Sequence, residues 1–255
     1  MSERINLLKI KIAKTVNAAK VLCTQEAIVL TKTNFTSQGV AITGELYTPA
    51  AATNTGLVVI AYGSDGLTDH LTGPWETMIR DYAESLAESG FVALIPDFLA
   101  VTGTTPGKTV LLSLIENRDI WQTALSDAID HGKGLPSVDA TRIGLLGFSL
   151  GGHLCLRVRA KAKILVEYFA PALDGIGFAG KLTHAQIHHG KADHFPGTGF
   201  ANAKAINDEL EREGTSTELF AYSGAGHGFI GSDQANSNAR KQSKKTTLTF
   251  FQTHL

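Results

Sequence analysis

The chain has 255 residues, of which 43% are hydrophobic and 18% are charged. This composition supplies enough apolar side chains for one sizeable core and excludes an intrinsically disordered chain. The formal net charge is −1, and Lys and Arg are scattered rather than gathered into a basic stripe. We therefore expect a small-molecule substrate and no nucleic-acid partner.

The sequence shows no sign of secretion or of a membrane anchor. Cys23 and Cys155 are too few for a disulfide framework, and neither lies in a metal-ligand spacing. No apolar run reaches the length of a membrane span, and residues 1–20 interleave charged with apolar side chains, unlike a signal peptide. We expect one domain over residues 1–255, cytoplasmic and monomeric or homodimeric, in which residues 1–25 form an N-terminal extension or helix.

The predicted elements begin with a strand that has one solvent-facing side. Residues 40–47 alternate apolar and polar side chains, which is typical of an antiparallel strand at the periphery of a sheet. Three later strand candidates, at residues 57–62, 91–96 and 142–147, are almost continuously apolar, the pattern of strands covered on both faces. Further strand candidates lie at residues 164–169, 185–189 and 218–222.

Helical periodicity fills the gaps between the later strands. Residues 75–87 and 120–129 carry apolar side chains at helical spacing, and a glycine follows each stretch as a stop signal. Two more helices are expected at about residues 199–213 and over the stretch that ends at Leu255. This alternation predicts an α/β fold: a mostly parallel central sheet with helices on both faces and a functional site at the carboxyl ends of the strands.

The segment Gly147-Phe-Ser149-Leu-Gly151 matches GxSxG directly after a predicted strand and before a predicted helix. A sharp strand-to-helix turn of this kind exposes the serine hydroxyl, so Ser149 is a candidate nucleophile. The N–H of Leu150, at the start of the helix, would then face a developing oxyanion. The alternatives are a serine in an ordinary tight turn and a dinucleotide-binding turn, but the Gly-x-Gly-x-x-Gly spacing of the second is absent.

A serine nucleophile needs a histidine base, which follows an acid along the chain in this type of site. His227 lies in the Gly-rich loop at residues 223–229, after the last predicted strand, and is the candidate base, with an ordinary loop histidine as the alternative. Other histidines beyond Ser149 compete less well: His184, His188, His189 and His194.

Asp193 follows the predicted strand at residues 185–189 and is the candidate acid that orients the imidazole. Asp97 and Asp174 are its rivals. Asp97, however, precedes the candidate nucleophile along the chain, and Asp174 lies in a loop with no predicted strand directly before it. The histidines near Asp193 lack a spacing that places two metal ligands on one helical face, so we expect no metal and no other cofactor.

The second oxyanion donor should come from the small-residue loop after the first central strand, at residues 62–66. Ser64 is the first choice for its backbone N–H, with Gly63 and Asp65 as alternatives. The predicted lining of the substrate pocket consists of Tyr62, Gly63, Asp65, Phe98 and Phe195.

Several ordered segments together resemble the dienelactone hydrolase family, a branch of the α/β-hydrolases. They lie at residues 39–47, 63–66, 94–97, 142–152, 190–193 and 224–229. The resemblance implies an α/β-hydrolase fold with Ser149, Asp193 and His227 in the triad positions. The namesake enzymes carry a cysteine nucleophile, a glutamate in the turn that here holds Gly63 and Ser64, and an arginine after the Pro-Asp segment. Their absence here indicates the serine branch and a substrate other than dienelactone.

These observations predict a hydrolase that cleaves an ester-type carbonyl of a small substrate, carboxylester or lactone, through an acyl-enzyme. A non-catalytic binding protein on the same scaffold is the alternative. The expected pocket segments, residues 62–72, 98–105 and 195–200, contain no Arg or Lys, although His70 and His194 could supply a cation. We therefore expect neutral esters to react at least about tenfold better than carboxylate-bearing lactones. Residues 101–114 could form a lid or a pocket wall.

Overall fold

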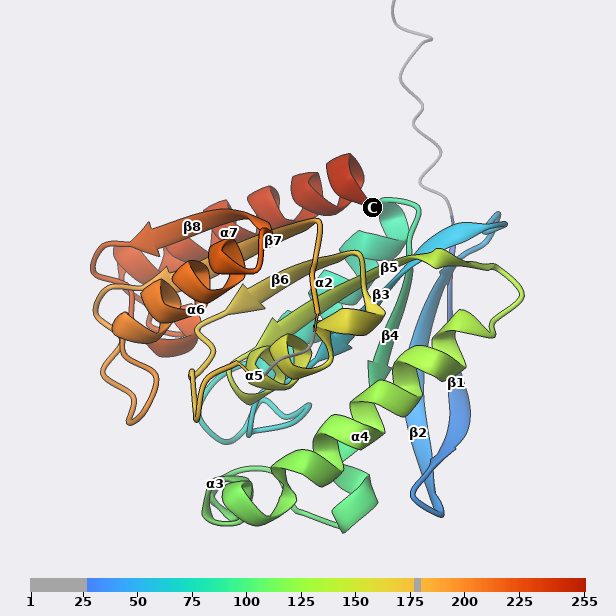
Figure 1. Ribbon diagram of the computed structural model, residues 1–255, viewed down its shortest axis with the longest axis horizontal. Coiled ribbons are helices and arrows are strands. Elements are labelled where there is room, and N and C mark those ends of the chain that lie inside the picture. The colour runs from blue at the N-terminus through green and yellow to red at the C-terminus, as the bar shows by residue number, and fades with distance from the viewer. Residues whose placement is uncertain (1–26, 177–179) are drawn as a thin grey trace, which may run out of the picture.

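The computed structural model describes residues 27–176 and 180–255. One eight-stranded sheet runs through the molecule, with helices on both of its faces (Figure 1). The predicted α/β architecture is therefore confirmed. The expected extension or helix at residues 1–25 lies outside the described residues.

The sheet has the strand order β1-β2-β4-β3-β5-β6-β7-β8. The strands β3 to β8 are mutually parallel, whereas β2 pairs antiparallel with both β1 and β4. Their bounds are β1 Ile28–Ser37, β2 Val40–Pro49, β3 Thr55–Ala61, β4 Val92–Pro96, β5 Val138–Phe148, β6 Ile164–Tyr168, β7 His184–Gly190 and β8 Ser216–Tyr222.

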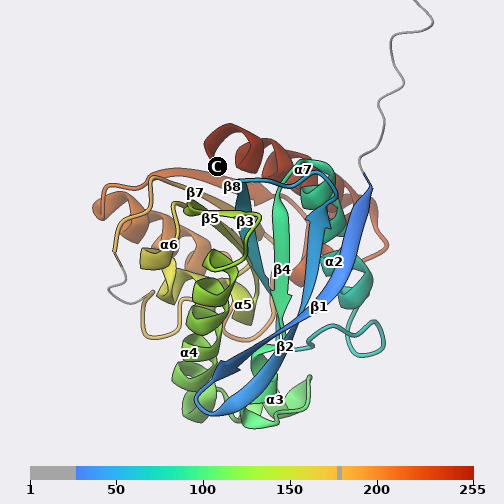
Figure 2. The same cartoon turned by 90° about the vertical axis from the view of Figure 1, so that its right-hand side faces the viewer.

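The β1–β2 hairpin extends one edge of the sheet, as Figure 2 shows, and β1 is an element that the sequence patterns did not reveal. Most of its side chains are exposed or half-buried, so it has no continuous apolar run and no clean alternation. Its pairing with β2 holds it in place along its whole length. Residues 40–47 do form the predicted antiparallel strand, although β2 lies one place in from the edge.

Helices α4, α5 and α6 cover one face of the sheet, and α2 and α7 cover the other (Figure 1). All the expected helices are present, and α4 begins before its apolar repeat and ends after it. The bounds are α2 Trp75–Glu88, α3 Lys108–Leu112, α4 Leu114–Lys133, α5 Leu150–Arg157, α6 Ala201–Arg212 and α7 Gln234–His254, with short 3₁₀ turns η1 Phe98–Thr102, η2 Arg159–Lys161 and η3 His227–Phe229. The unpredicted α3 is only one turn long.

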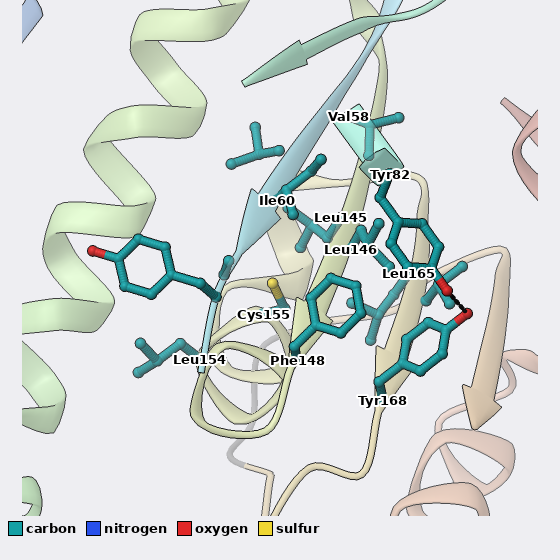
Figure 3. Close-up of a cluster of buried hydrophobic side chains, with 14 of the residues drawn as sticks. Val58, Ile60, Tyr82, Leu145, Leu146, Phe148, Leu154, Cys155, Leu165 and Tyr168 are labelled. Carbon is teal, nitrogen blue, oxygen red and sulfur yellow. Dashed lines mark hydrogen bonds between the residues drawn. The ribbon is translucent and has the colours of Figure 1, made fainter. Parts of the chain in front are cut away.

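The core lies between the central strands and the helices on either side (Figure 3). On the α2 side, the Tyr82 and Tyr168 hydroxyls share a hydrogen bond of 2.8 Å between their oxygens. On the α5 side, Cys155 is fully buried, and burial raises the pKa of its thiol well above the ordinary value. Each large apolar side chain removed from water contributes about 1.5–3 kcal/mol, so the strand ends that carry the site are held firmly. No helix within the described ranges is long and apolar enough to cross a membrane.

Candidate active site

Ser149 lies at the sharp turn between β5 and α5, with φ 51° and ψ −117°. A non-glycine residue in this region is strained, and surrounding structure has to hold it there. The Ser149 N–H donates a hydrogen bond of 2.9 Å to the carbonyl of Tyr168 on β6. A Cβ on Gly147 would meet the backbone of Gly152, and one on Gly151 would run into the backbone of Ala61. The two glycines of the motif are therefore required by backbone packing.

The imidazole of His227 connects Ser149 with Asp193. Its Nε2 lies 3.2 Å from Ser149 Oγ, and its Nδ1 lies 2.8 Å from Asp193 Oδ2. The ring stacks on Phe195, with 4.8 Å between ring centroids, and meets the edge of Phe169 at 4.9 Å. These aromatic contacts restrict the ring to an orientation in which it can bridge the serine and the carboxylate.

The carboxylate of Asp193 is completely buried, and both of its oxygens have polar neighbours. Oδ1 accepts hydrogen bonds from the Phe195 N–H at 3.0 Å and from Thr198 Oγ1 at 2.9 Å. Oδ2 faces His227 and also lies 3.1 Å from His189 Nε2. Burial by itself raises the pKa of Asp193, but the two histidines and the Phe195 N–H outweigh it and hold this pKa far below its ordinary range. The carboxylate therefore stays ionised and can orient the imidazole.

The rival acids have other partners. Asp97 Oδ1 accepts a 2.6 Å hydrogen bond from the Tyr62 hydroxyl. Asp174 lies at the surface and pairs with Arg118 across 3.1 Å. Neither carboxylate faces His227, so the geometry places Asp193 alone of the three beside the candidate base.

The remaining candidate histidines do not form a metal centre. His188 points to the opposite sheet face from His189, where its ring nitrogens lie within hydrogen-bond distance of Tyr222 and Gln186. His184 stacks on His254. Across residues 27–176 and 180–255, no group of three or more His, Cys, Asp or Glu side chains is arranged to hold a metal ion.

The loop after β3 lies directly against the nucleophile. A Cβ on Gly63 would be 3.3 Å from Ser149 Cβ, so a glycine allows this approach without displacement of the serine. The Ser64 carbonyl accepts a 2.8 Å hydrogen bond from the Gly107 N–H, which ties the loop to the start of α3. Leu150 is the first residue of α5, where the backbone N–H groups of a helix are unpaired within the helix. Ser64 and Leu150 stay the predicted oxyanion donors.

A cavity of about 350 Å³ opens beside Ser149 and His227. Three of the five predicted pocket residues, Gly63, Asp65 and Phe195, belong to its lining. The other two predictions were wrong, since the described cavities at Ser149 include neither Tyr62 nor Phe98. Both are buried in the core, where their rings stack 4.4 Å apart. The Tyr62 side chain turns inward because its hydroxyl is bonded to Asp97.

Sequence reasoning missed several residues that line the same cavity. Leu71 and Trp75 come from the start of the α2 region, and Lys108 and Leu111 come from α3. Lys108 lies outside the three segments that the sequence analysis considered, and it brings a cation to this cavity. The apolar residues that follow the Thr- and Gly-rich stretch at 101–105 were the available signal, because they supply a pocket wall at Leu111.

Known proteins resemble this chain over most of its length. The sequence profile of the dienelactone hydrolase family matches residues 42–255. The chain belongs to the dienelactone hydrolase family. It is accordingly a hydrolase of ester bonds with the α/β-hydrolase fold, as the sequence motifs predicted.

Individual relatives are distant. A Synechocystis sp. protein provisionally named a carboxymethylenebutenolidase is 25% identical over 244 residues, which cover 86% of this chain and 94% of that protein. A dienelactone hydrolase-like promiscuous phosphotriesterase from metagenomic libraries has a TM-score of 0.71 and 21% identity, covering 89% of this chain and 99% of the other. The dienelactone hydrolase of Anabaena variabilis has a TM-score of 0.61 and 19% identity, covering 86% and 96%. At these identities the structural likeness establishes the fold.

Proposed function

We propose that this family member is a serine hydrolase that cleaves carboxylic esters or lactones through an acyl-enzyme on Ser149. One observation carries the proposal: a strained elbow serine, an imidazole and an ionised buried carboxylate lie in a continuous series of contacts of 3.2 and 2.8 Å at the end of the large cavity. That order of groups is what nucleophilic catalysis by a serine requires.

In the acylation step, Ser149 Oγ attacks the ester carbonyl carbon while its proton passes to His227 Nε2. The carbonyl oxygen becomes an oxyanion, which the N–H groups of Leu150 and Ser64 stabilise. When the tetrahedral intermediate collapses, the carbon–oxygen bond to the alcohol breaks. The leaving oxygen then takes the proton from His227, so the alcohol departs neutral and the acyl group remains on Ser149.

Deacylation repeats the sequence with water. His227 accepts a proton from water as the water oxygen attacks the acyl carbonyl, and the second tetrahedral intermediate expels Ser149 Oγ. The serine regains its proton from His227, and the free acid leaves. Asp193 keeps its negative charge throughout and holds the tautomer of His227 in which Nε2 faces the serine.

Substitution of the nucleophile tests the proposal against a non-catalytic binding protein. Ser149→Ala should lower ester turnover by at least about 10³-fold, because one oxygen is lost and the residual rate comes from binding and the oxyanion donors alone. Ser223→Ala, an exposed serine in the loop before His227, is the matched control and should retain activity.

A fluorophosphonate probe gives a second readout by intact-protein mass spectrometry. The wild-type chain should gain the mass of one phosphonyl group, whereas Ser149→Ala should stay unmodified. A folded wild-type protein that neither reacts with the probe nor hydrolyses any ester would favour the binding protein.

Location in the cytoplasm and assembly as a monomer or homodimer stay predictions, to be checked by cell fractionation and light scattering.

A further inference from the structure

Two cavities of unequal size meet at Ser149. The larger has a volume of about 350 Å³, and the smaller has about 80 Å³. Four residues line both: Ser64, Leu111, Ser149 and Phe195. Ser149 therefore lies where the two spaces meet. An ester bound at Ser149 would have one of its two substituents in each cavity.

The catalytic groups distinguish the two sides. His227 lines the larger cavity, whereas Leu150 lines the smaller one. The leaving oxygen must lie near His227 Nε2, because that atom returns the proton to it. The alcohol part of the ester therefore extends into the larger cavity. The acyl part occupies the smaller one, with its carbonyl oxygen toward the N–H of Leu150.

The larger cavity suits a bulky apolar alcohol. Its walls include Leu71, Trp75 and Leu111, and it reaches the surface where Leu71 and Leu111 are 48% and 44% exposed. The Trp75 indole N–H is already bonded to Thr72 at 3.0 Å, so the ring offers the ligand an apolar surface. Burial of such an alcohol would also remove the exposed leucines from water, which adds to its affinity.

The smaller cavity suits a short acyl group. Pro171, Leu173 and Pro196 form much of its wall, and prolines restrict backbone movement that would enlarge it. The Thr198 side chain is held by its hydrogen bond to Asp193, so it cannot move to enlarge the cavity without breaking that bond. Its volume of about 80 Å³, against about 350 Å³ for the larger cavity, makes it the place for the shorter of the two substituents of an ester.

We infer that this enzyme selects esters of a short acyl group with a larger apolar alcohol, and that the two cavities at Ser149 set this asymmetry. The inference rests on the proposed acyl-enzyme function, because it uses His227 to tell the alcohol side from the acyl side. It goes further in naming the substrate class and the residues that decide it.

Two substrate series test the inference on the wild-type protein. In the first series, the acyl chain of 4-nitrophenyl esters lengthens from acetate to octanoate, while the leaving group stays the same. We expect kcat/KM to fall at least about tenfold from the shortest to the longest, a loss of about 1.4 kcal/mol in transition-state binding. In the second, n-alkyl acetates lengthen from ethyl to octyl, with alcohols of matched acidity. We expect kcat/KM to rise or stay level along this series.

Variants assign each preference to its cavity. Leu173→Ala should enlarge the acyl side and raise the octanoate-to-acetate ratio of kcat/KM at least about fivefold, with the alkyl acetate series unchanged. Leu71→Ala should lower kcat/KM for octyl acetate relative to ethyl acetate and leave the acyl series unchanged. Leu112→Ala is the control, because this leucine is 88% exposed and belongs to neither lining.

The possible failures can be told apart. If Ser149 takes up the fluorophosphonate and esters are hydrolysed, but acyl length has no effect or long acyl chains are preferred, the cavity assignment is wrong while the proposed function stands. If Ser149 is not labelled and no ester in either series reacts, the proposed function fails and this inference fails with it. Equal responses of Leu173→Ala and Leu112→Ala would also overturn the assignment.

Discussion

His189 Nε2 lies 3.1 Å from Asp193 Oδ2, the oxygen that His227 Nδ1 approaches at 2.8 Å. The side chains of His189 and Asp193 are both completely buried. One carboxylate oxygen is thus placed between two imidazoles, one from the rigid end of β7 and one from the loop after β8. His189 contributes to the low pKa of Asp193 and draws negative charge away from His227.

We predict that His189→Phe shifts the pH dependence of kcat/KM. Only a neutral His227 can accept the serine proton. Without His189, Asp193 presents more negative charge to His227 and favours the protonated imidazole. The acid limb of the activity profile should therefore move to higher pH, while the plateau falls by no more than about tenfold.

His188→Phe is the matched control for His189→Phe. It removes a buried histidine from the same strand, but one that faces the opposite side of the sheet. This variant should lose stability without a shift of the acid limb. If the acid limb of the kcat/KM profile lies at the same pH in the wild type and in correctly folded His189→Phe, then His189 has a packing role alone.

We predict that Asp193→Asn costs far more activity than Asp174→Asn. The amide would favour the wrong imidazole tautomer, and the expected loss in kcat is about 10³- to 10⁴-fold. Asp174→Asn should change kcat by less than about twofold, because this exposed carboxylate pairs with Arg118 at the surface. Steady-state kinetics of the two variants decide the matter, and equal losses would identify the wrong acid.

Glu167 should make the protein less stable as the pH rises. It is fully buried on β6, where Oε2 accepts a 2.9 Å hydrogen bond from the Ala170 N–H, and burial raises its pKa from 4.5 to about 7. Between these values the folded state binds a proton that the unfolded state has lost. The contribution of Glu167 to stability is therefore fully present below about pH 4.5 and is lost as the pH rises through 7, by on the order of 3 kcal/mol.

Urea unfolding at pH 5 and pH 8 tests this prediction. Glu167→Gln cannot ionise, so the stability of this variant relative to the wild type should increase from pH 5 to pH 8. Glu116→Gln, at an exposed position, should follow the wild type. The same pH dependence in Glu167→Gln and wild type would contradict a protonated Glu167.

Lys108 brings a cation to the large cavity, but it is an exposed one. An exposed charge pair contributes about 0.2–1 kcal/mol, so Lys108→Met should lower kcat/KM for a carboxylate-bearing lactone by only about 1.5- to 5-fold. Neutral esters should remain the better substrates of the wild type and be unaffected by the substitution. A wild-type preference for the anionic lactone at low and high salt would refute this expectation.

The sequence by itself predicted the parallel strands of the sheet and the three candidate residues Ser149, Asp193 and His227, which the structure brings together. Continuous apolar runs identify buried parallel strands because both faces of such strands need apolar side chains. Ser149 could be found because its strained turn requires glycines at neighbouring positions, and backbone constraints of this kind are local. Asp193 and His227 became candidates because each lies in the loop after a strand, and the two strands end at the same edge of the sheet.

The tertiary structure alone decided where side chains at that edge point and what encloses the substrate. Tyr62 and Phe98 adjoin the site in sequence, yet they turn into the core because Asp97 satisfies the tyrosine hydroxyl there. Lys108 lines the cavity from the start of α3, which the hydrogen bond from the Gly107 N–H to the Ser64 carbonyl ties to the loop after β3. Pocket walls and the double histidine contact on Asp193 depend on residues far apart in the chain. Short sequence patterns do not predict such contacts, because the packing of segments far apart in the chain sets their distances.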